Sequence, residues 1–346
     1  MQRPPHAPAD HPTLPRERIG VLVANLGTPD GTDYRSMRRY LSEFLSDRRV
    51  IDYSPLLWQP LLQGVILSRR PQKSGAAYRS IWNEERNESP LMTITRDQTE
   101  ALRKTLTERH GDAVQVEFCM RYGNPSTQSV VSRMVKEGCT RILFFPLYPH
   151  YAGATSATAN DQFFRALMKE TWQPTVRIVD PYYEKPAYIA ALAASVTRAL
   201  EGKEVDALVC SYHGLPQRYL MKGDPYHCQC AKTTRLLREA LGWERERVIT
   251  TFQSRFGPEK WLQPYTVEEV ARLAEAGKKR IAVIAPAFSA DCIETLEEIN
   301  EEIRESFEHA GGESFTYIPC LNDHPDHIAA LAGVIEENLG GWLSVG

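Results

Sequence analysis

The stretch RIAVIAPAFSADCIETLEEINEE, residues 280–302, joins two patterns that together indicate an α/β fold. Residues 280–286 form a short apolar run, which predicts a buried strand. Directly after it, Ile293, Leu296 and Ile299 recur at three-residue steps and predict a helix with one apolar side. A strand that leads into a helix is the unit from which parallel sheets are built.

The same unit recurs along the chain. Seven more short apolar runs are separated by helix-length gaps, at residues 19–24, 114–120, 141–147, 176–179, 207–212, 247–252 and 315–319. Amphipathic stretches such as residues 127–137 and 267–276 lie in most of these gaps. This alternation predicts parallel sheets with helices on both faces, and the eight strands fall into two sets of four.

The two sets resemble each other in sequence. The first strand of each set ends in NLGTP (residues 25–29) or YHGLP (residues 212–216), and the second ends in FCMRYGNP (residues 118–125) or FQSRFGP (residues 252–258). Self-similarity of this kind indicates a duplicated unit. We therefore predict two similar Rossmann-like halves, each a four-stranded parallel sheet flanked by helices, that face one cleft.

The expected halves cover residues 19–180 and 181–346, after a proline-rich leader at residues 1–18 that we expect to be disordered. The first half is longer than the second. Gly27 and Arg121 are 94 positions apart, whereas the matching Gly214 and Arg255 are 41 apart, which leaves about 53 extra residues in the first half. We place this insertion at about residues 42–90.

The insertion contains the apolar stretch YSPLLWQPLLQGVIL, residues 53–67, followed by Arg69, Arg70 and Lys73. Pro55 and Pro60 interrupt the stretch, which argues against a membrane-spanning helix. An apolar segment with a basic rim fits a lid over an apolar, acidic ligand, or a contact with a membrane surface. An ordinary helical hairpin packed on the core is the alternative.

Composition narrows the class of function. The 346 residues are 42% hydrophobic and 25% charged, with a net charge of −3 and no basic stretch interleaved with aromatic residues, so nucleic-acid binding is disfavoured. The seven cysteines are scattered and odd in number, which favours a reducing compartment such as the cytoplasm. Neither half has a dinucleotide fingerprint or a phosphate-binding loop, so a nucleotide cofactor is not expected.

The halves differ where chemistry is expected, at the carboxyl ends of the strands. His213 stands where the first half has Leu26, and Glu294 stands where it has Ala154. A histidine at this position is a proton acceptor, a metal ligand or a structural residue. One imidazole and one carboxylate are too few ligands for a permanent zinc site, so they suit a metal that passes through.

Further acids follow Glu294 along the predicted helix. Glu298 and Glu302 repeat at four-residue steps, and Asp291 precedes them. Like charges four residues apart destabilise a helix by roughly 0.2–0.5 kcal/mol per pair, so such a row is either tolerated or used. A solvated acidic face is the simplest interpretation of a charge run, and a path for cations or protons is the other.

Several motifs in the second half resemble the ferrochelatase family, whose members insert ferrous iron into protoporphyrin IX to form haem. They are SYHGLP (residues 211–216), GDPY (223–226), FQSRFGP (252–258), KWLQPYT (260–266) and ADCIET (290–295). The resemblance extends over residues 19–331. It implies a chelatase fold of two similar domains, with the last helix returning to pack on the first half.

The resemblance also implies roles for individual residues. His213 and Glu294 match the catalytic and metal-binding residues, and Asp291, Glu298 and Glu302 match a metal or proton relay on a helix with a π-type turn. The positions that match porphyrin contacts in the family are Leu26, Arg70, Lys73, Tyr78, Ser89, Arg121, Tyr122 and Trp261.

The implied partners are protoporphyrin IX and ferrous iron as substrates, with no required cofactor. An iron–sulfur cluster held through Cys228 and Cys230 is an alternative to loop thiols, and Cys292 stands where animal relatives have histidine. The resemblance implies a cytoplasmic enzyme that contacts the inner membrane through its lid. The oligomeric state is not predicted.

Two rival functions remain open on the sequence. One is a chelatase for another tetrapyrrole, coproporphyrin III or sirohydrochlorin, and the other is a non-catalytic haem or porphyrin carrier. Leu26 favours protoporphyrin, because coproporphyrin-using relatives tend to carry tyrosine at the matching position.

Overall fold

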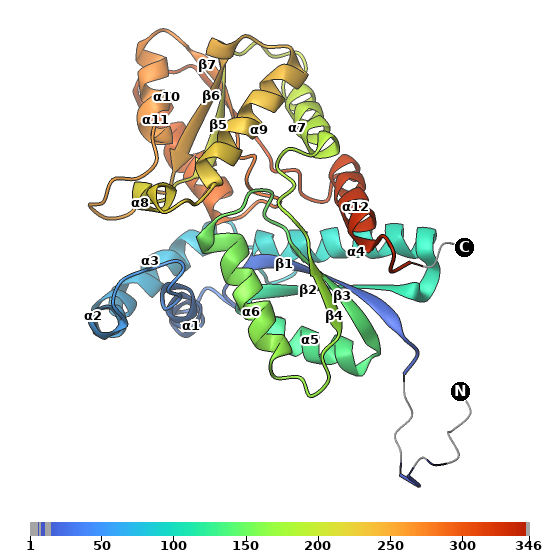
Figure 1. Cartoon of the computed structure of the whole chain (residues 1–346). Helices are drawn as coiled ribbons and strands as arrows, with labels where there is room; N and C mark the ends of the chain where they lie inside the picture. The colour runs from blue at the N-terminus through green and yellow to red at the C-terminus, as the bar shows by residue number, and fades with distance from the viewer. Residues whose placement is uncertain (1–5, 7, 11–14, 344–346) are drawn as a thin grey trace.

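The computed structural model describes residues 6, 8–10 and 15–343, so most of the expected leader lies outside the described residues. Two four-stranded parallel sheets form the framework (Figure 1). The first contains β1 (Arg18–Gly27), β2 (Val114–Tyr122), β3 (Cys139–Pro146) and β4 (Thr175–Ile178). The second contains β5 (Ala207–His213), β6 (Val248–Gln253), β7 (Arg280–Ile284) and β8 (Ser314–Ile318).

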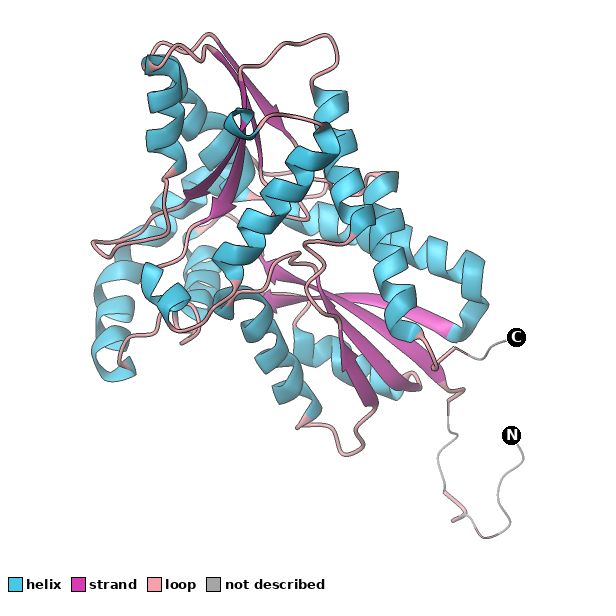
Figure 2. Cartoon of the chain, turned by 45° about the horizontal axis from the view of Figure 1, so that its top comes forward, coloured by secondary structure: helices cyan, strands magenta, loops and turns pink. Residues whose placement is uncertain are grey.

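The strand order is β2-β1-β3-β4 in the first sheet and β6-β5-β7-β8 in the second. The two orders are the same once the duplication is taken into account, and all strand pairs are parallel. The predicted fold class, two similar Rossmann-like halves, is therefore confirmed. Figure 2 shows the two sheets as separate units with helices around each.

The helices divide between the halves in chain order. The first half has α1 (Tyr34–Leu45), α2 (Pro55–Leu61), π-helix η1 (Leu62–Ile66), α3 (Leu67–Ser80), α4 (Pro90–His110), short 3₁₀ turn η2 (Gly111–Ala113), α5 (Thr127–Lys136), π-helix η3 (Gly153–Ala157) and α6 (Thr158–Leu167). The second half has α7 (Pro186–Ala199), α8 (Gln217–Met221), α9 (Tyr226–Leu241), 3₁₀ turn η4 (Arg245–Arg247), α10 (Thr266–Glu275), π-helix η5 (Glu294–Ile303), α11 (Arg304–His309) and α12 (Pro325–Leu339).

Both sheets are covered on each face, and one core joins the halves. Along β1, Val21 and Val23 face this joint core, whereas Leu22 and Ala24 face α5 and α6, as the two-residue period of a strand requires. The joint core also takes apolar side chains from β5, β7, α4, α7, α9 and α12. In the second half, α10 and α11 cover the outer face.

Helix α12 lies against α4 and β3 of the first half as well as α7. Its C-terminal end is fixed by two arginines of the first sheet. Arg177 Nη1 donates to the Asn338 carbonyl at 2.6 Å, and Arg141 Nη1 donates to the Trp342 carbonyl at 3.0 Å. The chain end thus ties the second half to the first.

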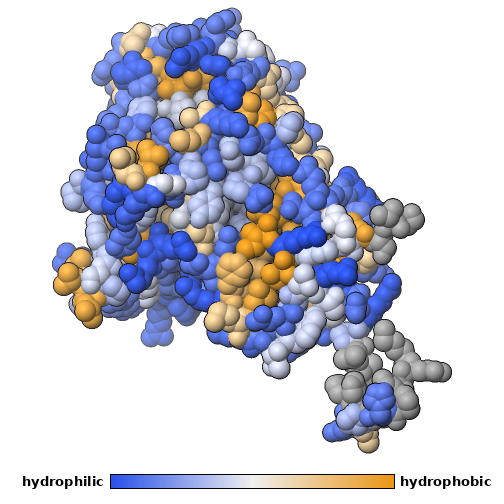
Figure 3. Space-filling model, viewed as in Figure 1, coloured by the Kyte–Doolittle hydropathy of each residue, from blue (hydrophilic) through white to orange (hydrophobic). Residues whose placement is uncertain are grey.

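The segment between α1 and α4 projects from the first sheet toward α8 of the second half (Figure 1). We call α2, η1 and α3 the lid. Trp58, Leu62 and Tyr78 of the lid are buried against α1, whereas Leu56 is 86% and Leu57 is 78% exposed. Figure 3 shows a group of apolar atoms at the lower left edge of the molecule, in the region where Figure 1 places α2.

Pro60 does not interrupt the lid as expected, because it lies inside α2 and the helical backbone continues through η1 into α3. A proline inside a helix removes one N–H donor, and the π-helical segment that follows is the kind of local adjustment that accommodates such a loss. Within the described part of the chain, no helix is long and apolar enough to cross a membrane.

Candidate active site

His213 is the last residue of β5, where it pairs with Gln253 at the end of β6. Its Nδ1 lies 2.7 Å from the carbonyl oxygen of Gly214. Because a carbonyl oxygen only accepts, Nδ1 must donate, which leaves the lone pair of the neutral ring on Nε2. The half-buried imidazole is therefore arranged to accept a proton or bind a cation through Nε2.

Glu298 is held by three donors from the end of β6. Ser254 donates its backbone N–H to Oε1 at 2.6 Å and its hydroxyl to Oε2 at 2.5 Å, and Gln253 Nε2 donates to Oε2 at 3.1 Å. Ser254 has φ +62°, in the left-handed region that non-glycine residues seldom adopt. Burial raises the pKa of Glu298, while the Ser254 hydroxyl and the nearby His213 act in the opposite direction.

Gln253 links the two predicted carboxylate residues. Its Nε2 also donates to the backbone carbonyl of Glu294, at 2.7 Å. Its Oε1 accepts from the buried Ser211 hydroxyl at 2.6 Å, and Ser211 in turn contacts Thr266 at 2.9 Å. This buried network fixes the orientation of the amide, so both nitrogen hydrogens point toward η5.

Sequence reasoning missed Gln253 and Ser254 although both lie in a quoted motif. Their counterparts in the first half are Cys119 and Met120. Both matching positions are therefore apolar in the first half and polar in the second, as are the positions of His213 and Glu294. A comparison of the two halves that included these two positions would have identified both residues as candidates.

The acidic residues of η5 run from the interior to the surface. Glu294 and Glu298 are half-buried, and Glu302 is exposed. A π-helix has more residues per turn than an α-helix, so residues four apart lie closer to one line along its surface. Burial and neighbouring acids raise the pKa of Glu297, while Lys73 of the lid acts in the opposite direction.

Asp291 occupies a different setting. Its Oδ1 accepts from the Tyr317 hydroxyl, from Thr295 Oγ1 at 3.1 Å and from the Cys320 N–H at 3.2 Å. Its Oδ2 accepts from Asn322 Nδ2 at 2.7 Å. A buried carboxylate with this many donors is a structural anchor for the start of η5.

Leu26, Tyr78 and Tyr122 form an apolar cluster together with Ile293. Burial raises the pKa of Tyr78, and the charge of Glu294 adds to this effect. Burial likewise raises the pKa of Cys292, with Glu294 as the next cause. The structure thus brings the lid, the end of β1 and the start of η5 together.

Trp261 and Arg70 lie at other edges of this region. The Trp261 ring packs on Gly214, where an added Cβ would lie 3.1 Å from it, and no described residue accepts from its buried Nε1. Arg70 of the lid lies 5.2 Å from the centre of the Phe256 ring in the second half. Burial lowers the pKa of Arg70.

Two predicted porphyrin contacts have other partners. Ser89 is buried and caps α4, since its Oγ accepts from the Met92 N–H at 3.2 Å. Arg121 is 7% exposed; its guanidinium pairs with Asp47 and donates through Nε to Thr158 Oγ1 at 2.6 Å. Sequence reasoning did not identify Asp47.

The cysteine pair is split between two environments. Cys228 is exposed on α9, whereas Cys230 is buried in the joint core near Tyr226. Over residues 6, 8–10 and 15–343, no three His, Cys, Asp or Glu side chains are grouped so that they could hold a metal ion.

Comparison with known proteins assigns the family. The ferrochelatase family model matches residues 18–339. The ferrochelatase of Rhodobacter capsulatus is 69% identical over 342 residues, covering 98% of this chain and 97% of the relative. The ferrochelatase of Allorhizobium ampelinum is 55% identical over 340 residues, with 98% of both chains covered.

Among solved structures, the sirohydrochlorin chelatase SirB from Bacillus subtilis subspecies spizizenii in complex with cobalt matches with a TM-score of 0.54. It covers 92% of this chain and 94% of its own, at 11% identity. SirB from Bacillus subtilis with Fe³⁺ matches with a TM-score of 0.53 at 12% identity, covering 93% and 96%. At such low identity these likenesses show a shared fold alone, whereas the family model and the close relatives establish that the chain belongs to the ferrochelatase family.

Proposed function

We propose that the protein inserts ferrous iron into protoporphyrin IX to form protohaem, with release of two protons, as the last step of haem biosynthesis. It is a metal chelatase, and so a lyase. One observation carries the proposal: His213, with its lone pair on Nε2, and the carboxylates of η5 lie in the same region. This region is beside the apolar cluster of Leu26, Tyr78, Tyr122 and Ile293, which we call the apolar wall.

In this mechanism a free-base porphyrin gives up its two ring protons as the cation enters. His213 Nε2 accepts a proton at the ring, because Gly214 holds the other nitrogen in its protonated form. Glu298 has a raised pKa and so can exchange protons nearer neutrality than an ordinary carboxyl. Glu302, exposed at the far end of the row, passes protons or cations to and from water.

The flat ring is held by complementary surfaces. Leu26, Tyr122 and Ile293 supply apolar contact, and Trp261 supplies an aromatic face. Arg70 and Lys73 of the lid provide the positive charges that propionate groups require. Ser89 and Arg121 contribute indirectly, by capping α4 and by supporting Tyr122.

The proposal also covers where the enzyme acts in the cell and whether it holds a cofactor. All seven cysteines are free, which supports a cytoplasmic enzyme, and the exposed leucines of the lid support a peripheral contact with the inner membrane. We expect no resident cofactor; the separation of the exposed Cys228 from Cys230 in the joint core supports the absence of a cluster held through this pair. An iron count and a visible spectrum of anaerobically purified protein test this point.

The central test is the variant His213→Ala with ferrous iron and protoporphyrin IX under anaerobic conditions. We expect a haem spectrum from the wild type and a fall in rate of about 10²-fold or more for the variant, because a positioned proton acceptor is lost. Porphyrin binding, measured by fluorescence quenching, should change little. His309→Ala, an exposed histidine on α11, is the matched control and should keep its activity.

Two outcomes would contradict the proposal. If the wild type inserts no metal into any porphyrin, the protein is a carrier and His213→Ala alters affinity alone. If coproporphyrin III is turned over faster than protoporphyrin IX, the tetrapyrrole is wrong although the reaction class stands.

A further inference from the structure

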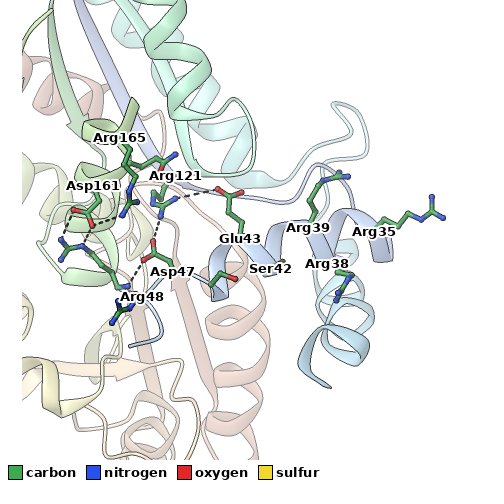
Figure 4. A pocket seen from close by; sticks show the side chains of 13 residues that line it. Arg35, Arg38, Arg39, Ser42, Glu43, Asp47, Arg48, Arg121, Asp161 and Arg165 are labelled. Carbon is green, nitrogen blue, oxygen red and sulfur yellow. Dashed lines mark hydrogen bonds and ion pairs between the residues drawn. The ribbon is translucent and has the colours of Figure 1, made fainter. Parts of the chain in front are cut away.

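A cavity of about 910 Å³ lies between α1 and α6 on the outer side of the first half, and seven arginines line it (Figure 4). They are Arg35, Arg38, Arg39, Arg48, Arg49, Arg121 and Arg165. We call this space the arginine cavity. Its lining includes only three acidic residues, Glu43, Asp47 and Asp161, so it carries four more positive than negative charges, although the net charge of the chain is −3.

The three acids already have donors of their own. Glu43 accepts from the Gly123 backbone N–H at 3.1 Å. Asp161 receives two hydrogen bonds from Arg49, at 2.6 and 2.9 Å. Asp47 pairs with Arg121 and also accepts from the Tyr122 hydroxyl at 2.9 Å. These carboxylates are therefore not available to neutralise the remaining arginines.

Two of the five remaining arginines have partners outside the lining: Arg39 pairs with Asp30 at 3.3 Å, and Arg38 donates to Gln63 Oε1 at 3.0 Å. The other three are in excess. Arg35 and Arg48 have no carboxylate within 4.0 Å in the part of the chain that the structure describes. Arg165 reaches only to 4.0 Å from Asp161, which Arg49 already occupies. The charges of the lining without a close partner are therefore those of Arg35, Arg48 and Arg165.

We infer that the arginine cavity binds a polyanion that carries at least two phosphate groups. The planar guanidinium group presents paired donors that match phosphate oxygens, and arginines from two helices and the loop after α1 line this cavity. In Figure 4, Arg48, Arg121 and Arg165 lie together around Asp47 and Asp161, whereas Arg35, Arg38 and Arg39 lie apart from them along α1. Its volume lies within the range of roughly 300–1,000 Å³ that small-molecule sites occupy.

The position of the arginine cavity separates it from the metal-insertion site. Its floor is the Arg121–Asp47 pair, and Arg121 lies 4.2 Å from the centre of the Tyr122 ring, on the reverse side of the apolar wall. A concentration of positive charge also disfavours a divalent cation at this place. The inference therefore does not depend on the proposed function, and binding can be measured without metal insertion.

The test is calorimetric titration of the full-length protein with pyrophosphate at low ionic strength. We expect saturable binding with one site per chain that weakens as salt is added, because screening reduces the attraction. The double variant Arg48→Gln with Arg165→Gln should weaken binding by about tenfold or more, since two charge-assisted contacts are lost. Arg235→Gln, on α9 of the second half, removes an exposed arginine elsewhere and should leave binding unchanged.

A wild type that shows no saturable binding, or a double variant that binds as the wild type does, would overturn the inference. Both substituted residues are exposed, and an unchanged thermal midpoint checks that the variant is folded. Tighter binding of citrate than of pyrophosphate would assign the cavity to polycarboxylates instead. Displacement of pyrophosphate by a polyglutamate peptide at lower concentration would assign it to an acidic protein.

Discussion

Gln253 is the residue on which the positions of both η5 carboxylates depend. One amide nitrogen donates to the backbone of Glu294 and to the side chain of Glu298, and the amide oxygen is held by Ser211. Neither contact brings Gln253 itself to the substrate. It is a positioning residue, and its loss should alter the pH dependence of the reaction as well as its rate.

Replacing Gln253 by Leu should lower the rate of insertion by about tenfold or more, with little change in the KM for porphyrin, because displaced catalytic groups act mainly on the chemical step. Glu298 loses a donor that stabilises its ionised form, so its pKa should rise further above the ordinary value. The acid limb of the rate profile should then move to higher pH. A pH series of initial rates for both proteins is the measurement.

Ser254→Gly serves as the companion variant, since glycine adopts φ +62° without strain and only the hydroxyl is lost. It should shift the acid limb in the same direction as Gln253→Leu. A pH profile that stays in place for both variants, with only protein stability reduced, would mean that the network is purely structural.

At the scale of elements, the duplication extends to an uncommon kind of helix. The π-helix η3 follows β3, the third strand of the first half, and η5 follows β7, the third strand of the second half. The π-helical start therefore belongs to the duplicated framework and is not a consequence of the acids. What distinguishes η5 is its row of carboxylates, whereas η3 contains only GATSA.

The lid gives an element-scale prediction about membranes. Replacing Leu56 and Leu57 by Glu should abolish sedimentation of the protein with vesicles containing anionic lipid, because each exposed leucine contributes about 1.5–3 kcal/mol when it enters an apolar phase. Insertion activity in detergent should persist, since neither side chain contacts the core. Met168→Glu, at the residue that follows α6 and is also 78% exposed, is the matched control and should sediment as the wild type does.

If the double variant still binds vesicles while high salt releases it, the attachment depends on the basic residues of the lid and not on its leucines. If the wild type does not sediment at all, the lid functions only as a cover for the porphyrin.

At the scale of the whole molecule, two buried histidines make the fold sensitive to acid. His150 Nε2 contacts Thr233 Oγ1 at 2.8 Å, across the two halves, and burial lowers its pKa to about 3. His327 of α12 donates through Nδ1 to the Asn322 carbonyl at 2.7 Å, and burial lowers its pKa to about 4. Both residues stay neutral in the folded state.

The unfolded chain binds these protons near pH 6.5, so it holds more protons than the folded chain below that pH. The free energy of unfolding should therefore be greatest above about pH 7 and should fall as the pH drops, by up to about 1.4 kcal/mol per pH unit for each histidine. Urea unfolding curves between pH 8 and pH 5 measure the loss. At pH 5 it should approach about 2 kcal/mol for each histidine.

His327→Gln keeps a donor for Asn322 and removes the titration, so its stability should depend less on pH over this window. His309→Gln, at an exposed position, should follow the wild-type curve. An unchanged pH dependence in His327→Gln would show that other groups cause the acid sensitivity.

The sequence by itself determined the framework and the location of the chemistry. Eight apolar runs predicted the eight strands. A parallel strand that is buried on both faces is a nearly continuous apolar run, so the local sequence alone identifies it. The two halves could be aligned with each other, and the differences between them singled out His213 and Glu294 without any structure. The resemblance to ferrochelatases, carried by continuous motifs, was confirmed by the comparisons.

The tertiary structure alone decided what each polar side chain contacts. Asp291, Glu298 and Glu302 are equivalent in a charge pattern, yet the first is saturated with donors, the second is held by Gln253 and Ser254, and the third is exposed. Likewise the Arg121 guanidinium pairs with Asp47, 74 positions away in the sequence, and lies over the Tyr122 ring. Hydrogen bonds are short and directional, so they depend on which atoms folding brings within about 3 Å of each other. When the two residues are far apart in the sequence, the sequence around either one does not indicate its partner.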